Sequence, residues 1–232
     1  MAAIGARARA LIKRTALAAG RVAPEPVVGA AHKLSGWLEI GRWLRDECAG
    51  RPRRMATREK LFDLIGAEVA QARTLYLEFG VFQGDSMRYW SRLLKHPAAR
   101  LHGFDSFEGL PERWSPDHAR GHFSTGGALP EIGDPRAEFF KGWFEQTLPG
   151  YVAPAHDALV VNLDADLYGS TRFVLGRIAP LIRVGAWLYF DEFSDPHHEF
   201  RAFREFVAES GMKFAAVAES RNFWNVAFRR VA

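Results

Sequence analysis

The chain has 232 residues, of which 48% are hydrophobic and 25% charged, as is ordinary for a globular protein with one sizeable core. It contains no run of about 18 apolar residues, which argues against a transmembrane helix. Cys48 is its single cysteine, which excludes an intrachain disulfide and a cysteine-based metal cluster and makes a reducing, cytoplasmic compartment the simplest expectation. The net charge is +4, and the basic residues do not recur as a stripe along the folded part of the chain, so the sequence gives no support for nucleic-acid binding.

The first 24 residues carry several basic side chains and no acidic one. Alanines and leucines lie between these bases, which predicts a basic helix. Two interpretations stay open: a solvated helix or tail, and a transit peptide or weak membrane-surface anchor. A secretory signal is disfavoured because two of the bases split its apolar run. The basic residues are Arg7, Arg9, Lys13, Arg14 and Arg21.

A second helix is predicted over roughly residues 30–48, where apolar residues recur at helical spacing. It is expected to pack against the main domain, and its aromatic residues would also suit a homodimer contact. The arginine- and proline-rich segment 50–54 predicts the boundary between a helical extension, residues 1–54, and a main domain, residues 55–232. Thr57 is the predicted N-cap of a helix that ends near residue 72.

From residue 74 onward, predicted strands alternate with helices. This alternation indicates an α/β fold with a mostly parallel sheet covered on both faces. The segment 113–135 is rich in Gly, Pro, His and Ser, and a loop of that length is usually a functional lid or disordered. The predicted strands are 74–79, 101–105, 137–141, 158–163 and 185–190, followed by an antiparallel hairpin of 213–218 and 223–229.

The segment TLYLEFGVFQGDS, residues 74–86, indicates a buried strand that breaks into a glycine turn and opens a helix. Gly80 permits a backbone conformation closed to other residues, and Gly84 permits close approach to the main chain. Asp105 follows Gly84 by 21 residues at the end of the second strand, where an acid accepts from two adjacent ribose hydroxyls. The turn also suits a purely structural role, and Asp105 a helix cap.

Acidic pairs end the fourth and fifth strands: Asp164 and Asp166 in NLDADLYGST, and Asp191 and Glu192 in FDEF. Because carboxyl ends of parallel strands meet at one edge of a sheet, we expect these acids to lie together at a ligand site. Such a cluster of oxygen ligands suits a hard divalent cation, most plausibly Mg²⁺. The alternative is that one acid caps a helix while the others face water.

Three further residues have two interpretations each. His197 and His198 follow the acidic edge, where either is a candidate general base or a solvated loop residue. Trp143, in FFKGWFEQTLP, either stacks on a purine or fills the space under the sheet.

The order EFGVFQGDS, FDSFEGLP, KGWFEQTLP, LDADLYGST and FDEF resembles the macrocin and mycinamicin O-methyltransferase family over roughly residues 57–230. These are class I enzymes that use S-adenosylmethionine. The resemblance implies a Rossmann-like, seven-stranded, mostly parallel sheet with an antiparallel last strand, helices on both faces, and the cofactor across the strand ends. The FDSFEGLP and LDADLYGST segments are the more specific part of the match.

The resemblance also implies roles for individual residues. The magnesium ligands would be Asp164, Asp191 and Glu192, although the family commonly has two aspartates where this chain has Asp191 and Glu192. The implied cofactor-binding residues are Glu78, Gly80, Phe82, Gly84, Ser86, Asp105, Ser106, Trp143 and Asp164.

The sequence therefore predicts Mg²⁺-assisted transfer of a methyl group to a hydroxyl of a small molecule, a sugar or glycosylated natural product. Asp164, Asp166 and His197 are the expected catalytic residues, with His197 or Asp166 taking the proton. Two alternatives are a non-catalytic methyltransferase-like binding module and a nicotinamide-dependent oxidoreductase. The second is disfavoured because Asp85 lies where a diphosphate would be repelled.

Overall fold

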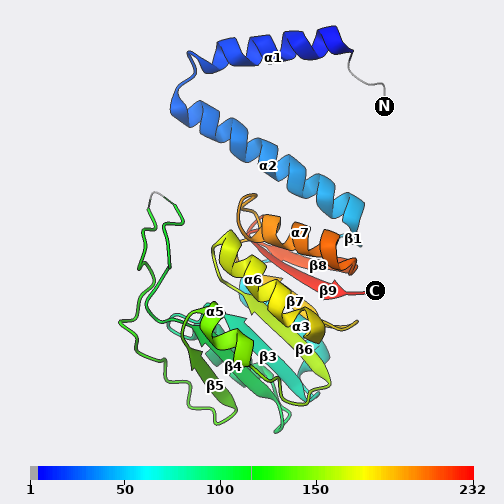
Figure 1. Ribbon diagram of the computed structural model, residues 1–232. Coiled ribbons are helices and arrows are strands. Elements are labelled where there is room, and N and C mark those ends of the chain that lie inside the picture. Colours follow the sequence, from blue (N-terminus) through cyan, green and yellow to red (C-terminus); the bar gives the residue numbers. More distant parts are fainter. Residues whose placement is uncertain (1–4, 116) are drawn as a thin grey trace.

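The computed structural model describes residues 5–115 and 117–232 (Figure 1). Two helices, α1 (Ala6–Gly20) and α2 (Glu25–Glu47), precede the sheet. The basic helix expected in the first 24 residues is confirmed. Helix α2 begins about five residues before its predicted start, because Pro26 lies in the first turn, where a missing N–H leaves no intrahelical bond unmade.

The main domain alternates strands with helices, as the sequence predicts. The short strands are β1 (Cys48–Ala49) and β2 (Arg53–Met55). The longer strands are β3 (Thr74–Phe79), β4 (Arg100–Asp105), β5 (Ala137–Lys141), β6 (Ala158–Leu163), β7 (Trp187–Phe190), β8 (Phe214–Ser220) and β9 (Asn225–Arg230). The helices are α3 (Arg58–Val69), α4 (Asp85–Leu93), α5 (Phe144–Thr147), α6 (Tyr168–Ile178) and α7 (Glu199–Ser210), with single 3₁₀ turns at Leu148–Gly150 and Ala179–Leu181.

The strands form one sheet, which has nine strands within the described residues, in the order β1-β8-β9-β7-β6-β3-β4-β5, with β2 also paired to β8. All pairs are parallel except β9, which runs antiparallel to β7 and β8. The strand order reverses between β3 and β6, so the ends of β3 and β6 flank a crevice at the carboxyl edge of the sheet.

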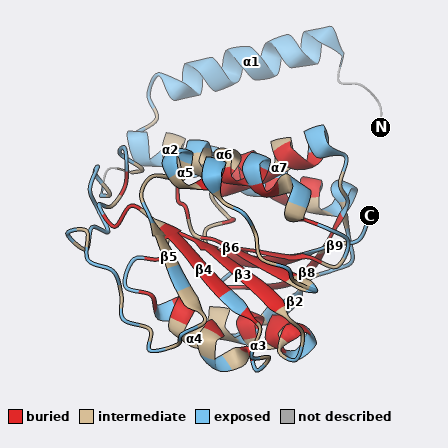
Figure 2. Cartoon of the chain, turned by 60° about the horizontal axis from the view of Figure 1, so that its bottom comes forward, coloured by how far each residue is buried: buried red, intermediate tan, exposed pale blue. Residues whose placement is uncertain are grey.

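Helices cover both faces of the sheet, and each face has its own apolar core (Figure 2). Helices α3 and α4 lie on one side, while α5, α6 and α7 lie on the other. The central strand β3 is buried along its whole length, as its unbroken apolar and aromatic sequence predicts.

Strands β1 and β2 were not predicted. Strands β3 to β9 reproduce the seven-stranded arrangement that the resemblance implies, and the two short strands extend it beside β8. With two and three residues, they are too short to show an alternating pattern in the sequence. The segment proposed as a boundary therefore joins the sheet edge, and the division at residue 54 stays a prediction.

Helix α2 is fixed to the domain by one face. Trp43 packs edge-on against Phe200 and Phe203, with ring centroids 5.5 and 5.6 Å apart. Gly36 approaches Pro196 so closely that a Cβ would lie 2.5 Å from the Pro196 ring. By contrast, none of the residues of α1, all of which are described, is buried. No helix among the described residues is both long and apolar enough to cross a membrane.

Candidate active site

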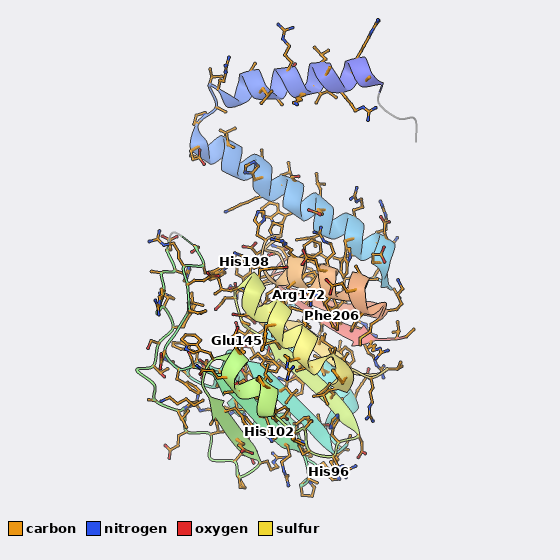
Figure 3. All side chains as sticks on the ribbon, in the orientation of Figure 1. His96, His102, Glu145, Arg172, His198 and Phe206 are labelled. Atoms are coloured by element: carbon orange, nitrogen blue, oxygen red, sulfur yellow. The ribbon has the colours of Figure 1, made fainter. Side chains whose placement is uncertain are left out.

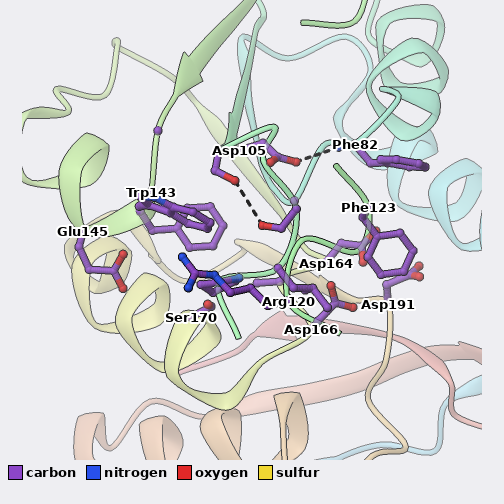
Figure 4. A pocket seen from close by; sticks show the side chains of 18 of the residues that line it. Phe82, Asp105, Arg120, Phe123, Trp143, Glu145, Asp164, Asp166, Ser170 and Asp191 are labelled. Carbon is purple, nitrogen blue, oxygen red and sulfur yellow. Dashed lines mark hydrogen bonds between the residues drawn. The ribbon is translucent and has the colours of Figure 1, made fainter. Parts of the chain in front are cut away.

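A cavity of about 540 Å³ opens at the carboxyl ends of the central strands (Figure 4). Its lining comes from segments far apart in the sequence: the ends of β3, β4, β6 and β7, the turn before α5, the first turn of α6 and the long loop. Of the residues predicted to hold a cofactor, metal or acceptor, it contains Gly80, Phe82, Asp105, Ser106, Trp143, Asp164, Asp166, Asp191 and Glu192.

Gly80 is required by packing at the floor of this cavity. Its φ is +89°, in the left-handed region, and a Cβ there would lie 1.8 Å from the carbonyl oxygen of Asp164. Two neighbouring strand ends therefore touch through the bare backbone of Gly80. Phe82 and Asp166, beside it, also have positive φ values of 49° and 56°, and backbone strain of this kind concentrates at functional sites.

Asp105 holds the turn after β3 in shape. Its Oδ2 accepts hydrogen bonds from the backbone N–H groups of Val81 (2.7 Å) and Phe82 (2.9 Å), and its Oδ1 accepts one from Phe107 (2.6 Å). The carboxylate thus joins the ends of β3 and β4 while lining the cavity. The sequence predicts a ribose contact for Asp105 but not this structural bond, which depends on how the two turns fold together.

The predicted acid pairs do converge at one edge of the cavity. Burial, reinforced by Asp191 and Asp166, raises the pKa of Asp164 well above its ordinary value. Burial and Asp191 raise the pKa of Asp166 to about 7, and burial and Asp166 raise the pKa of Glu192 to about 10. Each carboxylate disfavours ionisation of the next, so protonation or a bound cation would stabilise this group of acids.

A fifth acid, Glu199, contacts this edge through Glu192 and was not predicted from the sequence. It is fully buried at the start of α7, and its Oε2 accepts the backbone N–H of Glu192 at 2.9 Å. Burial raises its pKa well above the ordinary value. Its Oε1 and the Oε2 of Glu192 are buried without a hydrogen-bond partner in the described part of the chain.

Asp191 differs from its neighbours because donors surround it. Its Oδ1 accepts hydrogen bonds from the Tyr189 hydroxyl (2.5 Å) and the Asn225 amide (3.0 Å). The guanidinium of Arg58, from the first turn of α3, lies 3.6 Å from the same oxygen. Arg58 is therefore a cation that the protein itself supplies at the acidic edge, and the sequence gives no sign of it because it precedes Asp191 by 133 positions.

The magnesium prediction is not confirmed by this arrangement. Within residues 5–115 and 117–232, no three His, Cys, Asp or Glu side chains are placed to hold one metal ion. The oxygen-only chemistry of Asp164, Asp191 and Glu192 still fits a hard divalent cation, and the unpartnered Oε2 of Glu192 leaves a ligand atom free.

Three of the predicted cofactor residues do not line the cavity. Glu78 is 1% exposed under the sheet edge, where Tyr76 and Asn162 donate hydrogen bonds to its carboxyl group and burial raises its pKa to about 8. Gly84 is the left-handed N-cap of α4. Ser86 opens instead onto a second pocket, of about 360 Å³, whose lining also includes Arg58 and Arg88.

His197 and His198 also lie outside the cavity lining. His197 is exposed, and its backbone N–H donates to the carboxylate of Asp195. His198, at the start of α7 (Figure 3), accepts the backbone N–H of Tyr168 through Nδ1, and burial lowers its pKa. The structure thus does not bring either imidazole into contact with the acids.

The cavity walls hold residues that the sequence analysis did not single out. The long loop 113–135, predicted as a lid or a disordered segment, is a wall of the cavity: Arg120 points inward, and the Phe123 ring packs against Phe82 with centroids 5.7 Å apart (Figure 4). Glu145 and Ser170 complete the rim beside Trp143. The loop gives no periodic signal, so the sequence cannot say which of its side chains face inward.

The strand order, the single antiparallel strand and the crevice at the reversal of strand order define a Rossmann-like class I methyltransferase fold. A family model described as a methyltransferase domain matches residues 77–193, half of the chain. The chain belongs to this methyltransferase-domain family. The matched segment runs from β3 to the residues just after β7 and contains the strand ends that build the cavity floor.

Two curated relatives are similar to part of the chain. One, from Streptomyces olivaceus, is the 8-demethyl-8-(2,3-dimethoxy-alpha-L-rhamnosyl)-tetracenomycin-C 4'-O-methyltransferase, 30% identical over 54% of this chain and 57% of its own length. The other, from Micromonospora griseorubida, is the mycinamicin III 3''-O-methyltransferase, 28% identical over 54% of this chain and 59% of its own length. The chain thus spans less than two thirds of the curated relatives it matches.

Solved structures support the fold. The O-methyltransferase NovP superposes with a TM-score of 0.61 at 24% identity, covering 75% of this chain and 80% of NovP. The calicheamicin methyltransferase CalS11 gives a TM-score of 0.62 at 20% identity, covering 84% of this chain and 91% of CalS11.

Proposed function

We propose that the chain is an S-adenosylmethionine-dependent O-methyltransferase that methylates a hydroxyl group of a sugar or glycosylated natural product. The observation that carries the proposal is the single cavity in which Gly80, Asp105 and the acids Asp164 and Asp166 meet. The names of the two curated relatives, an O-methyltransferase of a rhamnosyl-tetracenomycin and an O-methyltransferase of mycinamicin III, support the choice of acceptor.

The cavity and the second pocket suit the two ends of S-adenosylmethionine. Trp143 and Phe144 offer flat apolar surface for the adenine, and Asp105 and Ser106 offer polar atoms at the strand end for the ribose. Ser86 and Arg58 line the second pocket, where the positive charge of Arg58 suits the cofactor carboxylate. Arg58 thus lines the second pocket and also lies 3.6 Å from Asp191, a residue of the cavity lining.

When bound, S-adenosylmethionine would supply an electrophilic methyl group; Asp164, Asp191 and Glu192 would be the residues to hold a divalent cation, which would act as a Lewis acid for the acceptor oxygen. The protein's own contribution is to position the acceptor and take its proton. With the acceptor hydroxyl held in the cavity and its proton passed to a cavity side chain, its oxygen would be placed to receive the methyl group. Binding the two reactants together removes much of the entropic barrier.

Asp166 is the proposed general base. It lines the cavity and is 8% exposed, whereas the other predicted base, His197, is exposed outside it. The backbone of Asp166 has a left-handed conformation, so the chain changes direction there, three residues after the end of β6 and beside the proposed acceptor site. The wall formed by Arg120 and Phe123 would exclude water, which otherwise competes with the acceptor as a nucleophile.

The proposal is tested by incubating the protein with methyl-labelled S-adenosylmethionine and a panel of glycosylated natural products, with and without a chelator. Label is expected in an ether of the acceptor, together with formation of S-adenosylhomocysteine. If the chelator leaves the transfer unchanged, the reaction needs no metal ion, and the rest of the proposal stands. Cofactor binding without transfer, unaffected by Asp164→Asn, would instead favour a non-catalytic binding module.

A further inference from the structure

Helix α1 and the outer face of α2 form a surface that nothing in the described chain covers. In α2, the residues opposite the buried face recur at positions 27, 30, 34, 37 and 41, which places them in one stripe along the helix. The large members of the stripe, Val27, Leu34 and Trp37, and the adjacent Leu38, are each more than half exposed. A stripe of this length exceeds the scattered apolar residues that any surface shows.

Helix α1, joined to α2 by the turn at residues 21–24, has exposed apolar residues of its own. None of its residues is buried, yet packing of one face normally supplies most of the stability of a helix in a protein. Leu11 and Ile12 are 66% and 57% exposed and lie about 100° apart around the helix, with Arg7 and Arg14 beyond Leu11 and Arg9 and Lys13 beyond Ile12. Leu17, 63% exposed, lies on the opposite side of the helix. The helix thus lacks its packing partner.

The charges on this surface indicate what that partner is. The first 24 residues contain five bases and no acid, and Lys33 and Arg42 lie at the two margins of the α2 stripe. The acid nearest the stripe in sequence, Glu39, is paired with Arg204 of α7. A second copy seated on this face would bring like charges together, which disfavours self-pairing.

We propose that α1 and the outer face of α2 dock onto a membrane surface rich in anionic phospholipid. The apolar side chains would enter the headgroup region while the flanking bases stay at the phosphates. Because Gly36 of α2 packs on Pro196, the docked helix stays attached to the domain. The proposal is independent of the methyl-transfer reaction.

The test is co-sedimentation of the full chain with vesicles of phosphatidylcholine alone and of phosphatidylcholine with 30% phosphatidylglycerol. Binding is expected only with the anionic lipid, falling as NaCl rises from 0.1 to 0.5 M because added salt screens the attraction. Replacing the four bases of α1 by glutamine is expected to weaken partitioning on the order of 100-fold or more. These substitutions are Arg7→Gln, Arg9→Gln, Lys13→Gln and Arg14→Gln.

A matched control carries the same change in net charge on the domain. It replaces four exposed bases outside α1 and α2: Lys60→Gln, Lys95→Gln, Arg100→Gln and Arg183→Gln. Its vesicle binding is expected to equal that of the unaltered chain. An equal loss in both variants, or equal binding to neutral vesicles, would overturn the proposal.

The apolar part is tested by Leu34→Glu with Leu38→Glu, which is expected to abolish vesicle binding without changing the unfolding midpoint, since both residues are exposed. Sedimentation velocity without lipid distinguishes the competing occupant. A stable dimer that this variant dissociates, with no vesicle binding by the unaltered chain, would assign the face to a second copy and contradict the proposal.

Discussion

Around the sheet, large aromatic and aliphatic side chains are buried on both faces, whereas along α1 and the outer face of α2 they are exposed. The charges differ in the same way. The domain has six acids around one cavity, whereas α1 carries four bases and no acid on its surface. The domain around the sheet is thus held by its own packing, whereas α1 and the outer face of α2 expose residues that a partner outside the chain would cover.

The largest expected effect concerns the base in the cavity. Asp166→Asn keeps the size of the side chain but cannot take a proton, so kcat is expected to fall by about 10²–10⁴-fold. His197→Ala, outside the cavity, is the control and is expected to keep nearly full activity. Steady-state methyl-transfer kinetics measure both. A large loss in His197→Ala with a small one in Asp166→Asn would restore the histidine as the base.

A glycine pair tests the packing of the cavity floor. Gly80→Ala places a Cβ against the backbone of Asp164 at a positive φ, so the unfolding free energy is expected to fall by about 3 kcal/mol or more. Gly176→Ala, in α6, would place a Cβ no nearer than 3.9 Å to the end of the Arg172 side chain, and it is expected to raise the unfolding free energy by about 0.5–1 kcal/mol. Urea denaturation compares them, and equal effects would contradict the close approach of the two strand ends.

Helix α2 has one tryptophan on its buried face, Trp43, and one on its exposed face, Trp37, so substituting each in turn compares the two faces. Trp43→Ala is expected to cost about 3–5 kcal/mol of unfolding free energy, because Trp43 packs among Phe200, Phe203 and Phe228. Trp37→Ala is expected to change it by less than about 0.5 kcal/mol, because Trp37 is 53% exposed. Similar losses in both variants would mean that the outer face is packed within the chain.

A smaller effect is expected from pH. Burial raises the pKa of Glu78 to about 8, so between its ordinary value near 4.5 and about 8 the folded state holds a proton that the unfolded state has released. Folding stability therefore falls as pH rises through this window, by about 1–3 kcal/mol between pH 5 and 9. Urea denaturation at several pH values measures the slope, which is expected to become shallower in Glu78→Gln by the share of Glu78, while the acids with raised pKa at the cavity edge keep the rest. Stability that rises over this range would contradict the assignment.

The strands of the domain are predictable from the sequence because each is a short apolar run bounded by turn residues. The acids at their ends are also predictable, since parallel strands align their carboxyl ends. Asp164, Asp166, Asp191 and Glu192 do converge as expected. The local pattern was sufficient wherever function depends on the last residues of a strand.

The remainder depends on contacts between distant segments. The position of Arg58 against Asp191, the inward direction of Arg120 and the two short strands beside β8 follow from tertiary packing. The periodicity of residues 30–48 indicates a helix but does not say that two of its faces are apolar. That required the burial of Trp43 and the exposure of Trp37.

The most direct test of the account is isothermal titration calorimetry of the full chain with S-adenosylmethionine. The account predicts one site per chain, binding that weakens about 10-fold or more in Trp143→Ala through loss of stacking, and unchanged binding in Trp37→Ala. A folded chain that binds no S-adenosylmethionine, or that binds it equally well in the Trp143→Ala variant, would contradict the assignment of this cavity as the cofactor site.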